Sequence, residues 1–168
     1  TRDGLNKFDG NKFIIYRHHS GDENSLSNNY VQTMFEDSKG GLWIGTQNGL
    51  NMFNPEQNNF IQFKYSDSKN PIQDNIIWDI IQLDDRTFWI ATSNGISQVD
   101  IRTKKISKLK KTIHNSLFLK NDTRGFLKTK DGNFWICNTQ DIVVYHPKKG
   151  FIKKYNFPIN NNSGKYSQ

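Results

Sequence analysis

Short apolar runs separated by polar turns recur along the whole chain. One stretch divides into runs of five to seven residues, at Tyr30–Glu36, Leu42–Thr46, Leu50–Asn54 and Asn59–Lys64. Runs of this length, bounded by Gly, Asn, Asp and Ser, predict β-strands rather than helices. Two further strands are expected near the start of the chain, at Leu5–Phe8 and Lys12–Arg17. The pattern therefore predicts an all-β protein built from many short strands.

The pattern has a fixed period, marked by three tryptophans. Trp43, Trp89 and Trp135 stand 46 residues apart, each within a similar apolar segment. A turn follows each segment, and in the first two units it holds the hairpin pair Asn-Gly, which ends at Gly49 and Gly95. Four strands and one tryptophan per repeat of this length are typical of β-propeller blades. We therefore expect structural roles for the three tryptophans and the two glycines.

A small residue always stands two positions after the tryptophan, namely Gly45, Ala91 or Cys137. Small residues are expected where a strand passes close to a neighbouring sheet. Cys137 is thus most simply a small core residue. Because it is the only cysteine, it cannot form an internal disulfide.

The repeat register divides the chain into blades. Thr1–Leu5 aligns with Thr46–Leu50, so the chain opens with only the third and fourth strands of a blade. We expect the outer half of a blade at residues 1–18, full blades at 19–64, 65–110 and 111–157, and the start of another blade or a linker at 158–168. The predicted fold is a β-propeller fragment of about three and a half four-stranded antiparallel blades, from a larger propeller of about seven. Closure would require further blades or a second chain.

Composition and charge add little to this picture. The chain is polar, with a mean hydropathy of −0.79, and it is basic, with a net charge of +7. A basic surface can attract anionic partners, but a solvated lysine surface is the simpler interpretation. The sequence has no apolar stretch of about 20 residues and no signal segment at its start. The lysines lie without interleaved aromatics, so we expect no contact with nucleic acid.

The segment from Asn29 to Phe63 resembles the two-component regulator propeller repeat, with the letters DSKGGLWIGT around Trp43. The Trp135 unit departs from it, because Asn138 and Asp141 replace the expected threonine and glycine. The resemblance implies the periplasmic sensor region of a membrane-anchored hybrid histidine kinase, the kind found in Bacteroidetes. It further implies signal transduction in which oligosaccharides are sensed and polysaccharide-utilisation genes are controlled.

Ligand contacts are expected on one face of the propeller, where two kinds of connection meet. The loops between blades, at His18–Asn28, Tyr65–Asp74 and Lys111–Lys120, share this face with the turns between second and third strands. The candidate residues are Gln47, Asn48, Trp78, Ser93, Asn94, Thr139 and Gln140. Polar turn residues also stabilise their own backbone, and Trp78 could pack in the core instead of stacking on a sugar. Asn29, Asn75 and Asn121 recur in every unit, which favours a structural role.

The remaining candidates favour binding over catalysis. The pair His18-His19 lacks the partners of a zinc site, and a lysine cluster (Lys104, Lys105, Lys108, Lys110 and Lys111) is expected to protect an outer edge or to bind anionic glycans. The sequence contains none of the common catalytic motifs. We therefore expect no enzyme activity, no metal and no cofactor.

Three functions remain open at this point. The first is an oligosaccharide sensor, with a neutral or anionic ligand, whose partners are that ligand and the remaining blades of the parent chain. The second is a rigid or dimer-forming platform, with the ligand bound elsewhere. The third is a free-standing propeller that binds or cleaves a polysaccharide. A homodimer of two such arcs would offer a route to ring closure.

Overall fold

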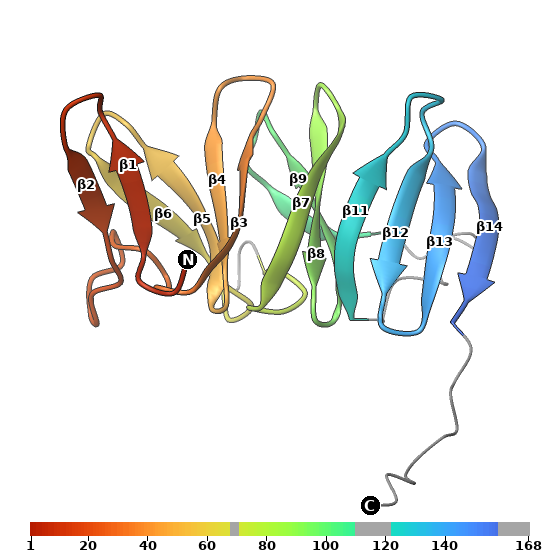
Figure 1. The fold of residues 1–168 in the computed structure, drawn as a ribbon, viewed down its shortest axis with the longest axis horizontal. Helices are drawn as coiled ribbons and strands as arrows, with labels where there is room; N and C mark the ends of the chain where they lie inside the picture. Colours follow the sequence, from red (N-terminus) through yellow and green to blue (C-terminus); the bar gives the residue numbers. More distant parts are fainter. Residues whose placement is uncertain (68–70, 110–121, 158–168) are drawn as a thin grey trace, which may run out of the picture.

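The computed structural model describes residues 1–67, 71–109 and 122–157, and these form fourteen β-strands in four antiparallel sheets (Figure 1). The N-terminal hairpin contains β1 (Leu5–Phe8) and β2 (Phe13–Tyr16). The Trp43 blade contains β3 (Val31–Glu36), β4 (Leu42–Thr46), β5 (Gly49–Asn54) and β6 (Asn59–Phe63). The Trp89 blade contains β7 (Ile77–Asp84), β8 (Thr87–Thr92), β9 (Gly95–Asp100) and β10 (Ile106–Lys108). The Trp135 blade contains β11 (Thr123–Lys128), β12 (Phe134–Asn138), β13 (Asp141–His146) and β14 (Gly150–Asn156).

Each four-stranded sheet is a meander in which every strand pairs with the next one along the chain. The first strands of the blades, β3, β7 and β11, lie side by side across the row of sheets (Figure 1). This is the arrangement of propeller blades around an axis, so the predicted fold class is correct. The six strand ranges that the sequence predicted agree with the structure to within one residue at each end.

The hydrophobic core lies in the seams, which are the contacts between neighbouring blades. Trp43 is fully buried, and its ring lies 4.8 Å from the ring of Phe88 in the next blade. Trp89 repeats this arrangement one blade later, with its ring 5.4 Å from that of Tyr145. Trp43 and Trp89 therefore each pack against the blade that follows their own.

Among the described residues, no further blade packs on the face of the Trp135 blade that points away from the other blades. Trp135 is half-buried and stacks on Tyr155 of its own blade, with ring centroids 5.6 Å apart. Leu127, on the same blade, is 61% exposed. Cys137 is also half-buried, so the expectation of a core position is met only in part.

The outer edge of the Trp43 blade is protected by a loop rather than by lysines. The Phe60 N–H of β6 donates to the Asn24 carbonyl at 2.9 Å, and the Gln62 side-chain amide donates to the Ser25 carbonyl at 2.7 Å. The loop before the blade thus accepts hydrogen bonds from β6, as a further strand paired with this edge would do. The edge of this blade is therefore covered by the chain itself.

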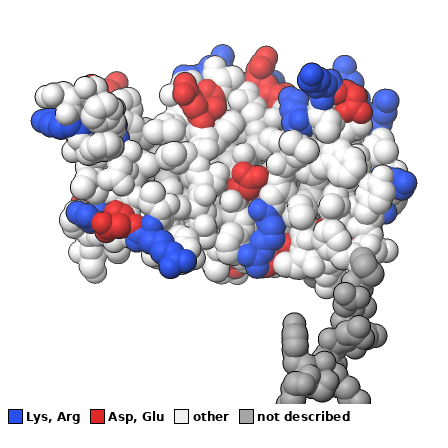
Figure 2. Space-filling model, in the orientation of Figure 1, with Lys and Arg blue, Asp and Glu red and all other residues white. Residues whose placement is uncertain are grey.

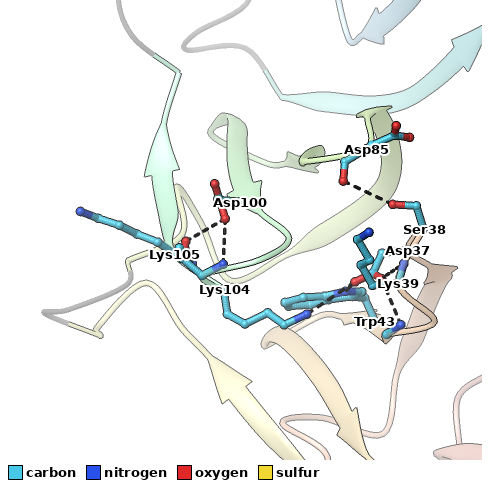
Figure 3. Close-up of polar contacts among 10 residues, drawn as sticks. Asp37, Ser38, Lys39, Trp43, Asp85, Asp100, Lys104 and Lys105 are labelled. Carbon is cyan, nitrogen blue, oxygen red and sulfur yellow. Dashed lines mark hydrogen bonds and ion pairs between the residues drawn. The ribbon is translucent and has the colours of Figure 1, made fainter.

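One seam is closed by the Asp37 clasp, which consists of Asp37, Trp43 and Lys104 (Figure 3). The buried Asp37 carboxylate accepts a hydrogen bond from Trp43 Nε1 at 2.8 Å, and Lys104 Nζ of the next blade lies 3.6 Å from it. The Lys104 ammonium also lies over the Trp43 ring, 5.2 Å from its centroid. Burial acts to raise the pKa of Asp37, but the hydrogen bonds from Trp43 and from backbone N–H groups, together with the Lys104 charge, hold this pKa below its usual range.

Lys104 was expected at an outer edge, and the structure corrects this. Its backbone has a φ of 57° in the turn before β10, a left-handed conformation that is uncommon outside glycine. This backbone directs the side chain across the seam to Asp37. Lys105 lies exposed in the same turn, and Lys110 and Lys111 lie outside the described residues.

Two repeated asparagines, Asn29 and Asn75, connect successive units by hydrogen bonds. The side-chain oxygen of Asn29 accepts from the His18 N–H at 2.6 Å, and that of Asn75 accepts from the Tyr65 N–H at 2.7 Å. Their carbonyl oxygens accept in the same way from Gly4 and Gly49 of the preceding unit. Each asparagine thus bonds to both ends of the outer hairpin before it. Asn121, the third member of this series, lies outside the described residues.

Candidate ligand-binding face

The turns between the second and third strands have the same geometry in the first two blades. Thr46 Oγ1 donates to the Gly49 carbonyl at 2.9 Å, and Thr92 Oγ1 donates to the Gly95 carbonyl at 2.8 Å. Both glycines have positive φ values, of 127° and 102°, which explains why glycine is favoured there. In the Trp135 blade, Asn138 and Asp141 build the turn instead, and the Lys154 ammonium pairs with the buried Asp141 carboxylate.

These turns present side chains with unused hydrogen-bonding capacity. Gln47, Asn94, Thr139 and Gln140 are exposed, whereas Asn48 and Ser93 are half-buried. Among the described residues, only Ser93 of these six has a side chain that is engaged in a hydrogen bond, with Trp78 Nε1. The other five remain available to a ligand, because the backbone N–H groups rather than the side chains complete the turns.

The inner strand of every blade carries the same irregularity near this face. The pairing register shifts between Val31 and Thr33, between Ile77 and Asp79, and between Thr123 and Gly125. A β-bulge of this kind redirects the side chain of the extra residue. The three redirected residues are Gln32, Trp78 and Arg124, which occupy equivalent positions in consecutive blades.

Two of these residues form a stack across the seam. The Arg124 guanidinium lies over the Trp78 ring, 3.9 Å from its centroid, and Trp78 Nε1 donates to Ser93 Oγ at 3.0 Å. Arg124 also pairs with Asp122, and its side chain is 44% exposed. Of the seven predicted ligand residues, the structure therefore joins Trp78 and Ser93 directly. Arg124 was missed, although it lies 46 residues after Trp78 and the repeat register could have indicated it.

The inner strands present a surface that is largely uncharged away from its rims. Charged side chains gather along the upper and lower edges of this face, with one acidic patch near the middle (Figure 2). Asp79 is the acidic residue of the inner strands that lies away from strand ends. Its carboxylate accepts from the Ile80 N–H and from the Phe126 N–H of the next blade, both at 2.8 Å. Asp79 therefore joins two adjacent inner strands.

Asp79 is expected to make stability depend on pH. Burial raises the pKa of Asp79, and the hydrogen bonds from Phe126 and Ile80 only partly oppose this. A carboxyl group whose pKa is raised in the folded state stabilises the fold. This contribution is complete below the ordinary pKa of 3.8, and it is lost as pH rises through the folded-state pKa. Replacing Asp79 by Asn removes this dependence. The difference in free energy of unfolding between Asp79→Asn and the unchanged protein should therefore change in favour of the variant as pH rises from about 3.8 toward neutrality. Urea unfolding at a series of pH values measures this, and parallel pH profiles for the two proteins would contradict it.

The other predicted candidates do not form a site. His18 Nδ1 hydrogen-bonds to the Leu26 carbonyl at 2.7 Å, while His19 is exposed. Within the described ranges no three His, Cys, Asp or Glu side chains are grouped closely enough to hold a metal ion. The loop Lys111–Lys120 lies outside the described residues. The part of the chain that the structure describes also contains no helix able to span a membrane.

Comparison with known proteins begins at the segment that builds β3 and β4. The family model of the two-component regulator propeller matches residues 25–48. This segment is similar to a two-component regulator propeller repeat. A search of curated proteins found no relative of the chain.

Solved structures share the arrangement of four-stranded blades seen here. The extracellular domain of a hybrid two-component system from B. thetaiotaomicron is similar over 92% of this chain, at 20% identity and a TM-score of 0.71. The extracellular domain of a one-component system from the same organism is similar over 95%, at 20% identity and a TM-score of 0.61. The chain spans 21% and 29% of these two proteins. At this identity the likeness shows the fold alone.

Proposed function

We propose that this chain is part of the ligand-sensing propeller of a membrane-bound hybrid two-component system and lies on the periplasmic side of the membrane. The regulator propeller repeat at residues 25–48 supports this proposal, as do structural neighbours that are extracellular domains of two-component and one-component systems. The ligand is an oligosaccharide, and its binding controls genes for polysaccharide use. The chain binds rather than catalyses.

The observation that carries the ligand class is the arrangement around Trp78. Its ring is held by Ser93 on one side and covered in part by Arg124, so its position is fixed before any ligand arrives. The turn that supplies Ser93 also carries the exposed side-chain amide of Asn94. A fixed aromatic surface with several hydrogen-bonding groups suits a sugar, which presents apolar C–H faces and many hydroxyls.

Signalling places a further demand on this site. A ligand shifts an equilibrium between two arrangements only when it binds one of them better. The Trp78–Arg124 stack lies across the seam between the Trp89 and Trp135 blades, so a ligand that contacts both residues senses how these blades are arranged. Contact across the seam thus supplies a means of discrimination.

Replacing Trp78 by alanine is expected to weaken oligosaccharide binding about tenfold or more, because a stacked aromatic is lost. Titration calorimetry of the chain with a panel of neutral, uronic-acid and sulfated oligosaccharides measures this. Phe13→Ala is the matched control, because Phe13 is an aromatic of the N-terminal hairpin with 68% exposure, and it should bind normally. Equal affinity of Trp78→Ala and the unchanged chain would refute the site, and the absence of binding by any glycan would refute the ligand class.

A rigid platform is the second candidate function. It is favoured by the Asp37 clasp and by the hydrogen bonds of Asn29 and Asn75. These contacts join neighbouring units through side chains, in addition to the hydrophobic core. In that case the ligand would bind in another part of the parent protein. Two arcs of this kind could then also associate as a homodimer, which light scattering would detect.

A further inference from the structure

An apolar cavity lies in the first seam, between the N-terminal hairpin and the Trp43 blade. It has a volume of about 270 Å³. Strands β1 and β2 of the hairpin line one side, and β3, β4 and β5 of the blade line the other. Six of its lining residues carry the argument below, and these are Leu5, Lys7, Tyr16, Met34, Leu42 and Phe53. All of them except the lysine have apolar or aromatic side chains, so the cavity suits an apolar occupant.

The repeat register gives each of these residues a counterpart in the next seam. Leu5 pairs with Tyr16 in the hairpin. Leu50 pairs with Phe63 at the same place in the Trp43 blade, and the other positions follow the repeat. In the same order, the six counterparts are Leu50, Met52, Phe63, Ile80, Phe88 and Val99. Every one of them lies in the hydrophobic cluster around Trp43 or packs against it. The cavity therefore lies at the position that a tryptophan ring fills in the next seam.

Within the described ranges, the hydrophobic cluster of the first seam contains no tryptophan. In the next seam, the Trp43 ring lies 4.8 Å from that of Phe88. Leu42 takes the position of Phe88 in the first seam and is only half-buried. Met34 is 58% exposed, whereas its counterpart Ile80 is 7% exposed. Without a ring between hairpin and blade, the apolar side chains of this seam stay uncovered.

One edge of β1 is available to a further strand. In the part of the chain that the structure describes, β1 pairs only with β2, whereas the corresponding strands β5 and β9 pair on both sides. The N–H and C=O groups along such an edge can accept an added strand. The turn that would follow this strand is already in place, because Thr1 Oγ1 donates to the Gly4 carbonyl. Thr46 Oγ1 donates in the same way to the Gly49 carbonyl between β4 and β5.

The complete blades fix where the tryptophan of such a strand would lie. Trp43 pairs with Met52 of β5, and Lys7 holds the position of Met52 on β1. A tryptophan opposite Lys7 would therefore direct its ring into the cavity. The Lys7 ammonium lies 5.8 Å from the centroid of the Phe53 ring, and a second ring beside it would add a favourable cation–π contact. Two positions further on, the strand would pass Leu5.

We propose that this cavity receives the tryptophan ring of an added β-strand, which pairs antiparallel with β1. The tryptophan lies opposite Lys7. A small residue two positions later lies opposite Leu5, as Gly45 lies opposite Leu50. The strand belongs to the preceding repeat of the parent propeller, so its origin rests on the proposed membership of a propeller but not on ligand binding at Trp78. A second copy of the chain is a poorer source, because β4, β8 and β12 each already pair on both sides.

The chain itself supplies a strand for the test. A copy of residues 29–45 is joined ahead of Thr1, so that its last glycine runs into Thr1 as Gly45 runs into Thr46. A second protein carries the same extension with alanine in place of its tryptophan. The tryptophan form should reach its urea midpoint about 1 M or more above the alanine form, because a large buried aromatic side chain is lost. In the tryptophan form, the N–H groups of β1 that face away from β2 should also exchange with deuterium more slowly than in the unextended chain.

Substitutions in the cavity wall locate the effect. Leu42→Ala should reduce the difference in midpoint between the two extended proteins, because the tryptophan loses a neighbour. Leu127→Ala is the matched control, since Leu127 is 61% exposed in the Trp135 blade, and it should leave the difference unchanged.

Three results would each overturn the proposal. They are equal midpoints for the two extended proteins, unchanged exchange along β1, and a dimer of the unextended chain that persists after extension, which would place a second copy in the cavity. Light scattering detects the dimer. Glycan titration of the same proteins tests the site at Trp78 separately, so failure of one proposal leaves the other standing.

Discussion

Replacing Asp37 by alanine should lower the free energy of unfolding by about 3 kcal/mol, because it leaves buried donors without an acceptor. The carboxylate accepts from Trp43 Nε1 and from the Lys39 and Gly41 N–H groups, and it neutralises Lys104. Urea unfolding followed by tryptophan fluorescence measures the change. Lys104→Met should lower the free energy of unfolding much less, because Lys104 is a third exposed and its removal leaves no buried donor without an acceptor.

The next blade shows another way to provide an acceptor for the tryptophan N–H. There Leu83 stands at the position of Asp37, and Trp89 Nε1 donates instead to Gln98 Oε1 at 3.4 Å. Met52 stands at the position of Gln98. The double variant Asp37→Leu with Met52→Gln should therefore recover part of the stability that Asp37→Ala loses. If Asp37→Ala unfolded at the same urea concentration as the unchanged protein, the clasp would have no energetic role.

Replacing Gly45 by alanine should lower the free energy of unfolding by about 1–3 kcal/mol through overpacking. A Cβ at this position would lie 2.5 Å from Ile77 Cγ2 of the next blade and 2.7 Å from Thr33 Cγ2. Both neighbours are β-branched and have restricted rotamers, and Ile77 is fully buried. Neither can move aside without disturbing the seam, and denaturant unfolding will show the loss.

A double-mutant cycle isolates this contact. Ile77→Ala alone leaves a cavity and should cost about 2–5 kcal/mol. In the Gly45→Ala background the same substitution should cost less, because the added methyl group occupies part of the space. The coupling energy between the two sites should be at least about 0.5 kcal/mol. If the changes in free energy of unfolding simply added, the residues at positions 45 and 77 would not be in energetically significant contact.

The sequence predicts the fold well because the strongest signal, the period of 46 residues, comes from local packing repeated in each blade. Trp43 and Trp89 lie on second strands buried between two sheets, so their positions follow from the repeat alone. The small residue at Gly45 follows for the same reason. Neither inference needs knowledge of which side chains meet across a seam.

Contacts across seams are where the sequence was least informative. Arg124 covers Trp78 because both occupy bulges of adjacent inner strands, and Lys104 reaches Asp37 across 67 positions of the chain. Both contacts depend on the rotation between blades and on single side-chain directions, which periodicity does not encode. Lysines on an outer strand were assigned to edge protection for this reason.

The Asp37 clasp has a consequence for how such a chain can evolve. Its acid belongs to one repeat and its cation to the next, so neither repeat carries the pair alone. The position of Lys104 is filled by Asn58 one repeat earlier and by Gly150 one repeat later, and all three have positive φ values. Deleting the Trp43 repeat or the Trp89 repeat would therefore remove one partner of the pair. The Trp43 and Trp89 blades are therefore not interchangeable, although their sequences follow the same repeat.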